Sequence, residues 1–442
     1  MEEPRYYDIR HVSGVSTHID IENGRIDSAG SSFYDVALLR VLGKKGWGLV
    51  SIENFSGKTK KDIEGFIREA MRYASVTEEE VILGDAPSGL LDVPKIENNP
   101  ADVSLEEKCD LLRAIESSAR IDGIVSTRAG YVEGSSTVYF TDSCGNEYSY
   151  PVCRSGYGIN AIAGRNGNMQ AARESERTIA GLNMYHKEHK GMEAAERALK
   201  LLEAAPAKGG IMNAVLDQEL AGVFAHEAVG HASEGDLVKE GVSVLKGRIG
   251  EKIGDSALSV TDDPTLHEFG FMPLDAEGVR PKKTAIIKKG VLNSYIHNRQ
   301  TLALIGDGDA GHARAEGGAV PQVRMSNTFI ENGDSTYDEI VAECRNGVLL
   351  KGSRGGQVDP GRGVFQFNAE YGYVIENGEL AGMIRDVSLS GDILKTMHNI
   401  VLCGNDLRLN QGYCGKGGQS VPVTDGSPHV LLKDAVVGGQ GV

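Results

Sequence analysis

Hydrophobic and polar residues alternate along the first third of the chain, in short runs separated by turn residues. Alternation with a period of two is typical of strands that are buried on one face. The predicted strands are Ser16–Ile21, Arg25–Asp27, Asp35–Leu42 and Trp47–Ile52. Because Glu22-Asn23-Gly24 and Gly43-Lys44-Lys45-Gly46 are turn-forming sequences, we expect neighbouring strands to pair as hairpins.

Helical periodicity interrupts these strands. In Lys60–Ser75 and Ser104–Ala119 the apolar residues recur every three or four positions, which predicts amphipathic helices. A second meander is expected from Gly123 to Ile162, with a turn at Asp142–Asn146. Two further helical stretches are predicted over Gln170–Leu182 and Glu193–Ala205.

From Ile211 onward the chain is rich in strand-like runs punctuated by glycine, with hairpin turns predicted near Lys288–Gly290, Glu331–Gly333 and Glu376–Gly378. We expect one helix in this half. The break at Pro206 and Gly209-Gly210 predicts a domain boundary. The fold class is therefore predicted as α+β, with an N-terminal α/β-type domain of hairpins and helices (1–206) and a strand-rich C-terminal domain (207–442) with one motif-bearing helix.

Length and composition agree with this division. A chain of 442 residues exceeds what one hydrophobic core usually organises, so two domains are expected. A hydrophobic share of 40% and a charged share of 24% are ordinary for a globular protein. Glycine is frequent, at 57 residues against 13 prolines, which favours tight turns between strands over a helical bundle.

The charge balance excludes several classes of partner. With 46 Lys and Arg against 62 Asp and Glu, the formal net charge is -16, so nucleic acid and anionic membrane surfaces are not expected partners. No apolar stretch approaches the about 20 residues that a membrane span requires. The start, Met1-Glu2-Glu3-Pro4, has no basic flank or apolar signal core, so we expect a cytoplasmic protein. The six cysteines are scattered along the chain and are expected to be reduced thiols.

The candidate chemistry lies in the segment His226-Glu227-Ala228-Val229-Gly230-His231. The preceding sequence predicts a strand over Met212–Leu216, a helix N-cap at Asp217 and an apolar stripe leading into His226. The motif is therefore expected on a helix. It differs from the His-Glu-x-x-His pattern of metallopeptidases, because the two histidines are five positions apart instead of four.

This spacing conflicts with regular helix geometry. Residues five apart on an ideal α-helix are rotated by about 140° from one another, too far for both imidazoles to reach one ion. A π-bulge, or a helix that ends at Gly230, removes the conflict, and glycine makes either distortion easy. We therefore predict a helix break or bulge between Ala228 and His231.

The motif predicts a zinc-dependent peptidase. Zinc held by neutral imidazoles lowers the pKa of a bound water to about 7, and Glu227 is placed to take the proton of this zinc-activated water as general base. Catalytic zinc normally has three protein ligands, and spacing leaves several candidates for the third. These are Glu234, Asp236, His312, Cys403 and Cys414. His186 and His189 are instead expected at the solvated surface, and His267-Glu268 lacks a second histidine at helical distance.

Further ordered segments resemble one family. These are Ala232–Asp236, Arg324–Thr328, Gly355–Asp359, Gly404–Leu407 and Cys414–Val423. Together with the motif they resemble the TldD/PmbA family of metallopeptidases, and specifically its TldD, or catalytic, branch. The resemblance covers most of residues 205 to 442 and is weaker over the first 200 residues.

The resemblance implies a metal site of two histidines and one cysteine. The ligands would be His226, His231 and Cys414, holding one Zn2+ per chain. It also implies peptides or unfolded polypeptides as substrates, and a dimer with a TldE/PmbA-like subunit or with itself. Two other interpretations stay open: a non-catalytic scaffold or partner subunit, and a zinc amidase that acts on a small molecule.

Two smaller questions also stay open at this stage. Glu234 and Asp236 either accept hydrogen bonds that orient the histidines or cap the end of the helix. The glycine pairs at Gly317-Gly318 and Gly355-Gly356 either mark sheet edges along which a substrate strand lies or form ordinary turns.

Overall fold

The computed structural model describes residues 3–439. Met1 and Glu2, which open the segment expected to lack a targeting signal, lie outside the described residues. Within residues 3–439 the first six strands form one antiparallel sheet in the order β3-β2-β1-β4-β5-β6. These strands are β1 (Tyr6–Glu22), β2 (Arg25–Leu42), β3 (Trp47–Glu53), β4 (Ile124–Asp142), β5 (Glu147–Arg165) and β6 (Asn168–Thr178).

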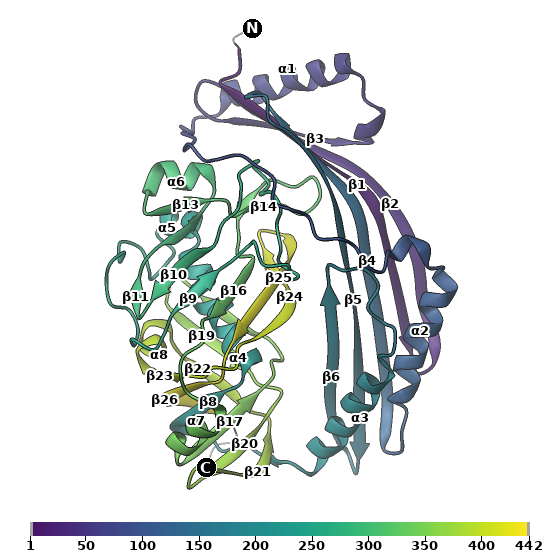
Figure 1. Ribbon diagram of the computed structural model, residues 1–442, viewed down its shortest axis with the longest axis vertical. Coiled ribbons are helices and arrows are strands. Elements are labelled where there is room, and N and C mark those ends of the chain that lie inside the picture. Colours follow the sequence, from purple (N-terminus) through teal and green to yellow (C-terminus); the bar gives the residue numbers. More distant parts are fainter. Residues whose placement is uncertain (1–2, 440–442) are drawn as a thin grey trace.

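The predicted hairpins are confirmed, with strands longer than expected. The turn between β1 and β2 has positive φ angles at Asn23 and Gly24 (49° and 80°), the conformation that a tight hairpin turn requires. The sheet curves as an arch beside the C-terminal half of the chain (Figure 1). The face turned away from that half carries helices α1 (Lys60–Val76), α2 (Leu105–Ser118) and α3 (Glu188–Glu203).

One predicted helix is wrong. Gln170–Leu182 was expected to be helical because Ala, Glu and Arg favour helices, but most of it belongs to strand β6, which pairs along its whole length with β5. Asn166 and Gly167, with φ angles of 49° and 82°, form the turn between the two strands. Intrinsic helix propensity is a weak preference per residue. Pairing with β5, a strand of 19 residues, outweighs it here.

The C-terminal half contains two large sheets. The six-stranded sheet has the order β11-β10-β9-β16-β25-β24, and the ten-stranded sheet has the order β18-β19-β22-β26-β8-β17-β20-β21-β7, with β23 paired to β26. The first comprises β9 (Val260–Asp262), β10 (Thr284–Lys288), β11 (Val291–Leu292), β16 (Asn327–Ile330), β24 (Arg408–Lys416) and β25 (Gln419–Ser427).

The ten-stranded sheet is built from segments far apart in the sequence. Its strands are β7 (Ala205–Pro206), β8 (Gly210–Leu216), β17 (Gly347–Lys351), β18 (Gly356–Asp359), β19 (Val364–Asn368), β20 (Tyr371–Glu376), β21 (Glu379–Arg385), β22 (Ser388–Asp392), β23 (Ile400–Cys403) and β26 (Val430–Gly438). Two small sheets pair β12 (Tyr295–His297) with β13 (Gly308–Ala310), and β14 (Ala313–Arg314) with β15 (Gln322–Val323). Because β7 joins this sheet, the chain enters the C-terminal half at Ala205; the domain boundary at 206 stays a prediction.

The expectation of one helix in this half is wrong. Residues 207–439 contain α4 (Gln218–Phe224), α5 (Gly235–Glu240), α6 (Arg299–Ile305), α7 (Tyr337–Cys344) and α8 (Ile393–Asn399). Each has only six to eight residues, too few to display a helical period clearly in the sequence. Among residues 3–439, no helix is long and apolar enough to cross a membrane.

The predicted turns of this half have different outcomes. Hairpins are confirmed at Lys289-Gly290, between β10 and β11, and at Asn377-Gly378, between β20 and β21. The third prediction, at Glu331–Gly333, is wrong, because β16 is followed by a loop whose Gly333 amide donates to the Gly404 carbonyl (2.7 Å). Of the two glycine pairs, Gly356 opens β18 at an edge of the ten-stranded sheet, whereas Gly317 lies in a turn with φ 48°.

Candidate metal centre

Strand β8 leads directly into the motif helix, which lies between the two large sheets of the C-terminal half. Asp217 caps α4, its carboxylate accepting the Leu220 amide at 3.0 Å. The helix continues as a π-helical turn over Ala225–Gly230 and then a 3-10 turn over His231–Ser233. The His231 amide donates to the His226 carbonyl, a bond between residues five apart. The predicted bulge is therefore confirmed, and its bond joins the two histidines themselves.

Small residues let this distorted helix pack closely against its neighbours. A Cβ atom added to Gly230 would lie 2.9 Å from Cγ of Met325, and one added to Gly222 would lie 2.8 Å from Oδ1 of Asp425 on β25. Ala225, Ala228 and most other residues of the segment are completely buried. The position of the motif is thus fixed by packing on several sides.

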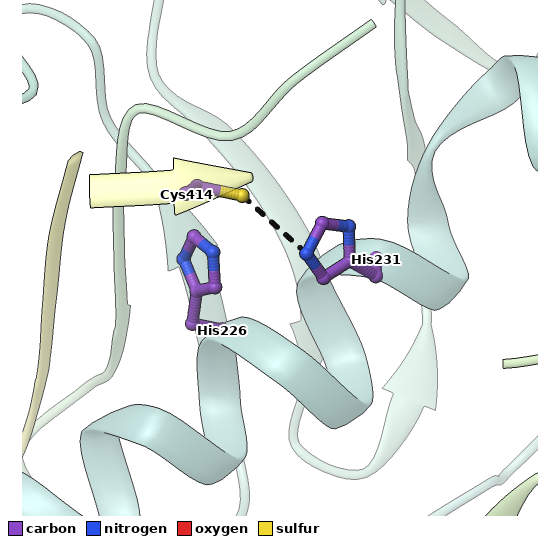
Figure 2. A group of neighbouring side chains, drawn as sticks. All are labelled: His226, His231 and Cys414. Atoms are coloured by element: carbon purple, nitrogen blue, oxygen red, sulfur yellow. Dashed lines mark hydrogen bonds between the residues drawn. The ribbon is translucent and has the colours of Figure 1, made fainter. Parts of the chain in front are cut away.

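Three side chains converge beside this turn. Nitrogen and sulfur atoms of His226, His231 and Cys414 all lie within 4.8 Å of one another, and no other group of three or more His, Cys, Asp or Glu residues with this property occurs among residues 3–439. Cys414 comes from β24, on the opposite side of the cluster from the helix (Figure 2). Its Sγ lies 3.4 Å from His231 Nε2, and the two imidazole planes stand at 86° to each other.

The cluster is buried and incomplete. His226 is 3% exposed, and both of its ring nitrogens are inaccessible to solvent and without a hydrogen-bond partner among the described residues. A buried polar atom without a partner is costly and therefore rare. Burial alone would raise the pKa of the Cys414 thiol, but the neighbouring His226 and His231 outweigh burial and lower that pKa to about 4. Two imidazoles and a thiolate that point at one spot are a ligand set suited to zinc.

Glu234 and Asp236 connect the motif to β24. Glu234 Oε2 lies 3.1 Å from His231 Nδ1 and accepts a hydrogen bond from Lys416 Nζ at 2.9 Å. Lys416 also donates to both carboxylate oxygens of Asp236, each at 2.8 Å. Burial would raise the pKa of Glu234, but His231 and Lys416 hold it below its usual value. Glu234 thus orients a histidine, as one of the two alternatives expected, and Asp236 pairs with a lysine that the motif search did not single out.

Glu227 has a different environment. Its side chain is 34% exposed, whereas that of Glu234 is fully buried. Its Oε2 lies 3.7 Å from His231 Nε2, the nitrogen that faces Cys414. A carboxylate beside the cluster that keeps contact with solvent is in position to exchange protons with it.

The other proposed third ligands lie elsewhere. His312 is fully buried and contacts Asp262 at 3.1 Å, and that carboxylate also accepts hydrogen bonds from Ser326. Burial raises the pKa of the Cys403 thiol to about 12, so this sulfur is protonated at neutral pH. His186 and His189 are exposed, as expected, and His267 is exposed as well.

Two carboxyl groups near the motif were not expected from the sequence. Burial, and to a smaller degree the charge of Glu227, raise the pKa of Asp425 to about 7, although His226 opposes this. Burial and the neighbouring Asp217 raise the pKa of Glu219 to about 7 as well. Neither residue belongs to a recognisable spacing, since the fold brings β25 against α4.

Comparisons with known proteins cover nearly the whole length of the chain. Three family models match in order: PmbA/TldA metallopeptidase domain 1 over residues 7–74, the central domain over 98–202 and the C-terminal domain over 209–439. The chain is 43% identical over 436 residues to a metalloprotease of Archaeoglobus fulgidus, covering 98% of this chain and 100% of the relative. It is 33% identical to a zinc metalloprotease TldD homolog of Saccharolobus solfataricus, covering 55% of each chain.

Solved structures share the fold. A Thermotoga maritima protein superposes with a TM-score of 0.81 at 22% identity, covering 98% of this chain and 96% of the other. TldE from Thermococcus kodakarensis superposes with a TM-score of 0.77 at 17% identity, covering 98% and 97%. At these identities the likeness concerns the α+β fold, which is as predicted.

Proposed function

The chain belongs to the PmbA/TldD family of metallopeptidases, and from that premise we propose that it is a zinc-dependent peptidase with His226, His231 and Cys414 as ligands of one zinc ion and Glu227 as general base. The observation that carries this proposal is the buried imidazole of His226, whose two nitrogens lack a partner among the described residues. An ion between His226, His231 and Cys414 would satisfy one of them.

The surroundings of His231 prepare it for such a role. The carboxylate of Glu234 lies 3.1 Å from His231 Nδ1 and favours a proton on that nitrogen, so in the neutral ring the lone pair is on Nε2, which faces Cys414. Lys416 compensates part of the negative charge that Glu234 and Asp236 bring into the interior. When bound, zinc would lower the pKa of a water molecule and polarise the carbonyl of the scissile peptide bond.

Glu227 would move the protons of the reaction. Its carboxylate is adjacent to His231 Nε2 and is partly exposed, so an incoming water molecule can donate a hydrogen bond to it. Glu227 would accept the proton of the attacking water and then deliver it to the departing amine nitrogen. These two transfers leave the carboxylate in its starting state, ready for another cycle.

The substrate and the partner are parts of the same proposal. We infer that unfolded or small peptides are cleaved in the cytoplasm. A dimer, either with a TldE-like subunit or with a second copy of this chain, is supported by the shared fold with TldE.

The test is cleavage of unfolded peptides by the purified protein, followed by mass spectrometry, with the chain alone and with any co-purifying subunit. Glu227→Gln should retain zinc and reduce turnover by about 10^2- to 10^4-fold, the usual contribution of general acid–base catalysis. Glu240→Gln, an exposed carboxylate on α5, serves as the matched control and should cleave as the unmodified chain does. Undiminished cleavage by Glu227→Gln would refute its role, and a chain that cleaves only small amides would point to an amidase.

A further inference from the structure

A cavity of about 490 Å³ lies between the arch and the C-terminal half. One wall is the face of β4 and β5 opposite to the helices, where Gly134 leaves open space. The other wall comprises Phe271–Leu274, Ala313–Gly317 and, on the β25 strand of the β24–β25 hairpin, Ser420–Pro422. Tyr413, which precedes Cys414, also lines it, so the cavity adjoins the strand that carries the candidate zinc ligand.

Three guanidinium groups line this cavity, those of Arg10, Arg154 and Arg314. None of them lies within 4.0 Å of a carboxylate among residues 3–439. Each donates instead to main-chain carbonyls: Arg10 to Gly317, Arg154 to Phe269 and Phe271 at 3.2 and 2.8 Å, and Arg314 to Met325 at 2.6 Å.

Such carbonyl contacts orient an arginine without neutralising it. A guanidinium has five N–H donors, so one or two bonds leave several free. Arg314 is only 5% exposed, and burial together with the nearby charge of Arg154 lowers its pKa to about 9. Arg324 is 1% exposed and donates to the Cys414 carbonyl at 2.5 Å. Its Nε has no partner among the described residues. Buried cations without counter-charges are costly unless they serve an anion.

The acidic residues of the cavity are already engaged. Glu133 accepts hydrogen bonds from Lys108 and Tyr131, each at 2.6 Å. Glu316 accepts the Ser420 amide at 2.7 Å. With Glu133 paired to Lys108, three arginines share the cavity with one further carboxylate, that of Glu316, so positive charge exceeds negative charge there, in a chain whose formal net charge is -16.

A second cavity, of about 390 Å³, continues along the arch and shares Val132 and Tyr413 with the first. Arg128, Arg173 and Arg177 line it, and the Arg177 guanidinium lies 5.6 Å from the centre of the Tyr413 ring. Its floor includes cross-strand neighbours Gly130 and Gly158. The two cavities together form a passage with a glycine floor and arginines along its length.

We propose that this passage binds a carboxylate of the substrate peptide, at Arg10, Arg154 and Arg314. The carboxylate is either the C-terminal group or an Asp or Glu side chain, since the fork of a guanidinium matches both. This inference rests on the proposed peptidase function and adds a preference for anionic peptides. A peptide fits better than nucleic acid because the arginines lie in a hollow between the two halves of the chain and the chain as a whole is acidic.

The test measures binding to the full, zinc-loaded Glu227→Gln chain, which does not consume the peptide. Three labelled peptides share one neutral sequence: one is amidated, one has a free C-terminus, and one is amidated with a single glutamate. We expect at least one carboxylate peptide to bind about 10-fold or more tightly than the neutral peptide. If the peptide with the free C-terminus binds more tightly, the arginines recognise the terminal carboxylate. If the peptide with the glutamate binds more tightly, they recognise the side-chain carboxylate.

Arg154→Gln and Arg10→Gln, made in the same background, should each remove most of this preference while zinc content and circular dichroism stay unchanged. Two variants are used because each arginine also links the arch to the C-terminal half, and they do so through different carbonyls, those of Gly317 for Arg10 and of Phe269 and Phe271 for Arg154. Arg280→Gln is the control: its side chain is exposed and donates to the Leu90 carbonyl, outside the cavity, so the preference should persist.

Equal affinity for the three peptides would overturn the proposal, as would single-stranded DNA binding as tightly as the glutamate peptide. Failure of the peptidase function leaves a different signature. In that case the unmodified chain cleaves none of the peptides, although the carboxylate preference and its loss in Arg154→Gln persist.

Discussion

Two buried polar clusters differ in whether the chain completes them. Arg40 donates to both carboxylate oxygens of Asp8, at 3.0 and 2.5 Å, and to Glu277 at 2.9 Å. Each of its three guanidinium nitrogens thus donates to a carboxylate. His226, equally buried beside His231 and Cys414, has neither nitrogen matched among the described residues. The chain's own residues satisfy the Arg40 cluster, whereas they leave both ring nitrogens of His226 without a partner among residues 3–439.

The clusters also differ in what their loss should affect. Arg40 and Asp8 lie on the arch and Glu277 lies in the C-terminal half, so the first cluster holds the two halves together. The histidine–cysteine cluster lies within the C-terminal half, between the motif helix and β24. Removing a member should reduce stability in the first case and metal content in the second.

The largest effect is expected from His226→Ala. Zinc measured by atomic absorption should fall from about one ion per chain to nearly none, and peptide cleavage should fall by at least about 10^3-fold. His189→Ala, an exposed histidine outside the cluster, should retain both. Full zinc content in His226→Ala would show that the cluster is not the metal site.

Arg40→Ala should have the next largest effect, on stability. It leaves two buried carboxylates without their cation, which costs about 3–5 kcal/mol of the free energy of unfolding. Denaturant unfolding measures this, and zinc content below the transition should be unchanged. Arg165→Ala removes an exposed pair with Glu203 and should cost about 1 kcal/mol or less. Similar losses of unfolding free energy in Arg40→Ala and Arg165→Ala would contradict the structural role of the Arg40 cluster.

Glu234→Gln should have the smallest effect, because it keeps every ligand and changes only the charge behind His231. Zinc affinity, measured by competition with a chelator, should fall about 10- to 100-fold. Asp236→Asn is the matched control, since Asp236 shares Lys416 but does not touch His231. If both substitutions weaken zinc equally, the lysine pair rather than the histidine contact is responsible.

The sequence was informative where structure is local. The hairpin at Asn23-Gly24 follows from turn chemistry, and the bulge before His231 follows from helical geometry and one glycine. β6 was missed because Ala, Glu and Arg favour a helix and only pairing with β5 reveals the strand. Of the five α-helices of the C-terminal half, only the motif helix α4 was expected, and the other four were missed because each makes about two turns.

The candidate site also has a local part, which the sequence predicted, and a long-range part, which depends on folding. His226, Glu227 and His231 are adjacent in sequence, whereas periodicity gave no reason to prefer Cys414, 183 residues beyond His231, over Cys403; only the family resemblance favoured it. Lys416 carried no signal, because its partners Glu234 and Asp236 are brought to it by folding. The Arg40 cluster likewise depends on Glu277, 237 residues away.

Strand β24 lies at the edge of its sheet, and edge strands can pair with strands of other molecules. Two of its carbonyls are already occupied, that of Gln411 by Arg177 and that of Cys414 by Arg324. Both contacts come from outside the hairpin, since Arg177 lies 234 residues from Gln411 and Arg324 lies 90 residues from Cys414. The place of the Cys414 sulfur beside the histidines therefore depends on side chains of other segments, and not on the β24–β25 hairpin alone.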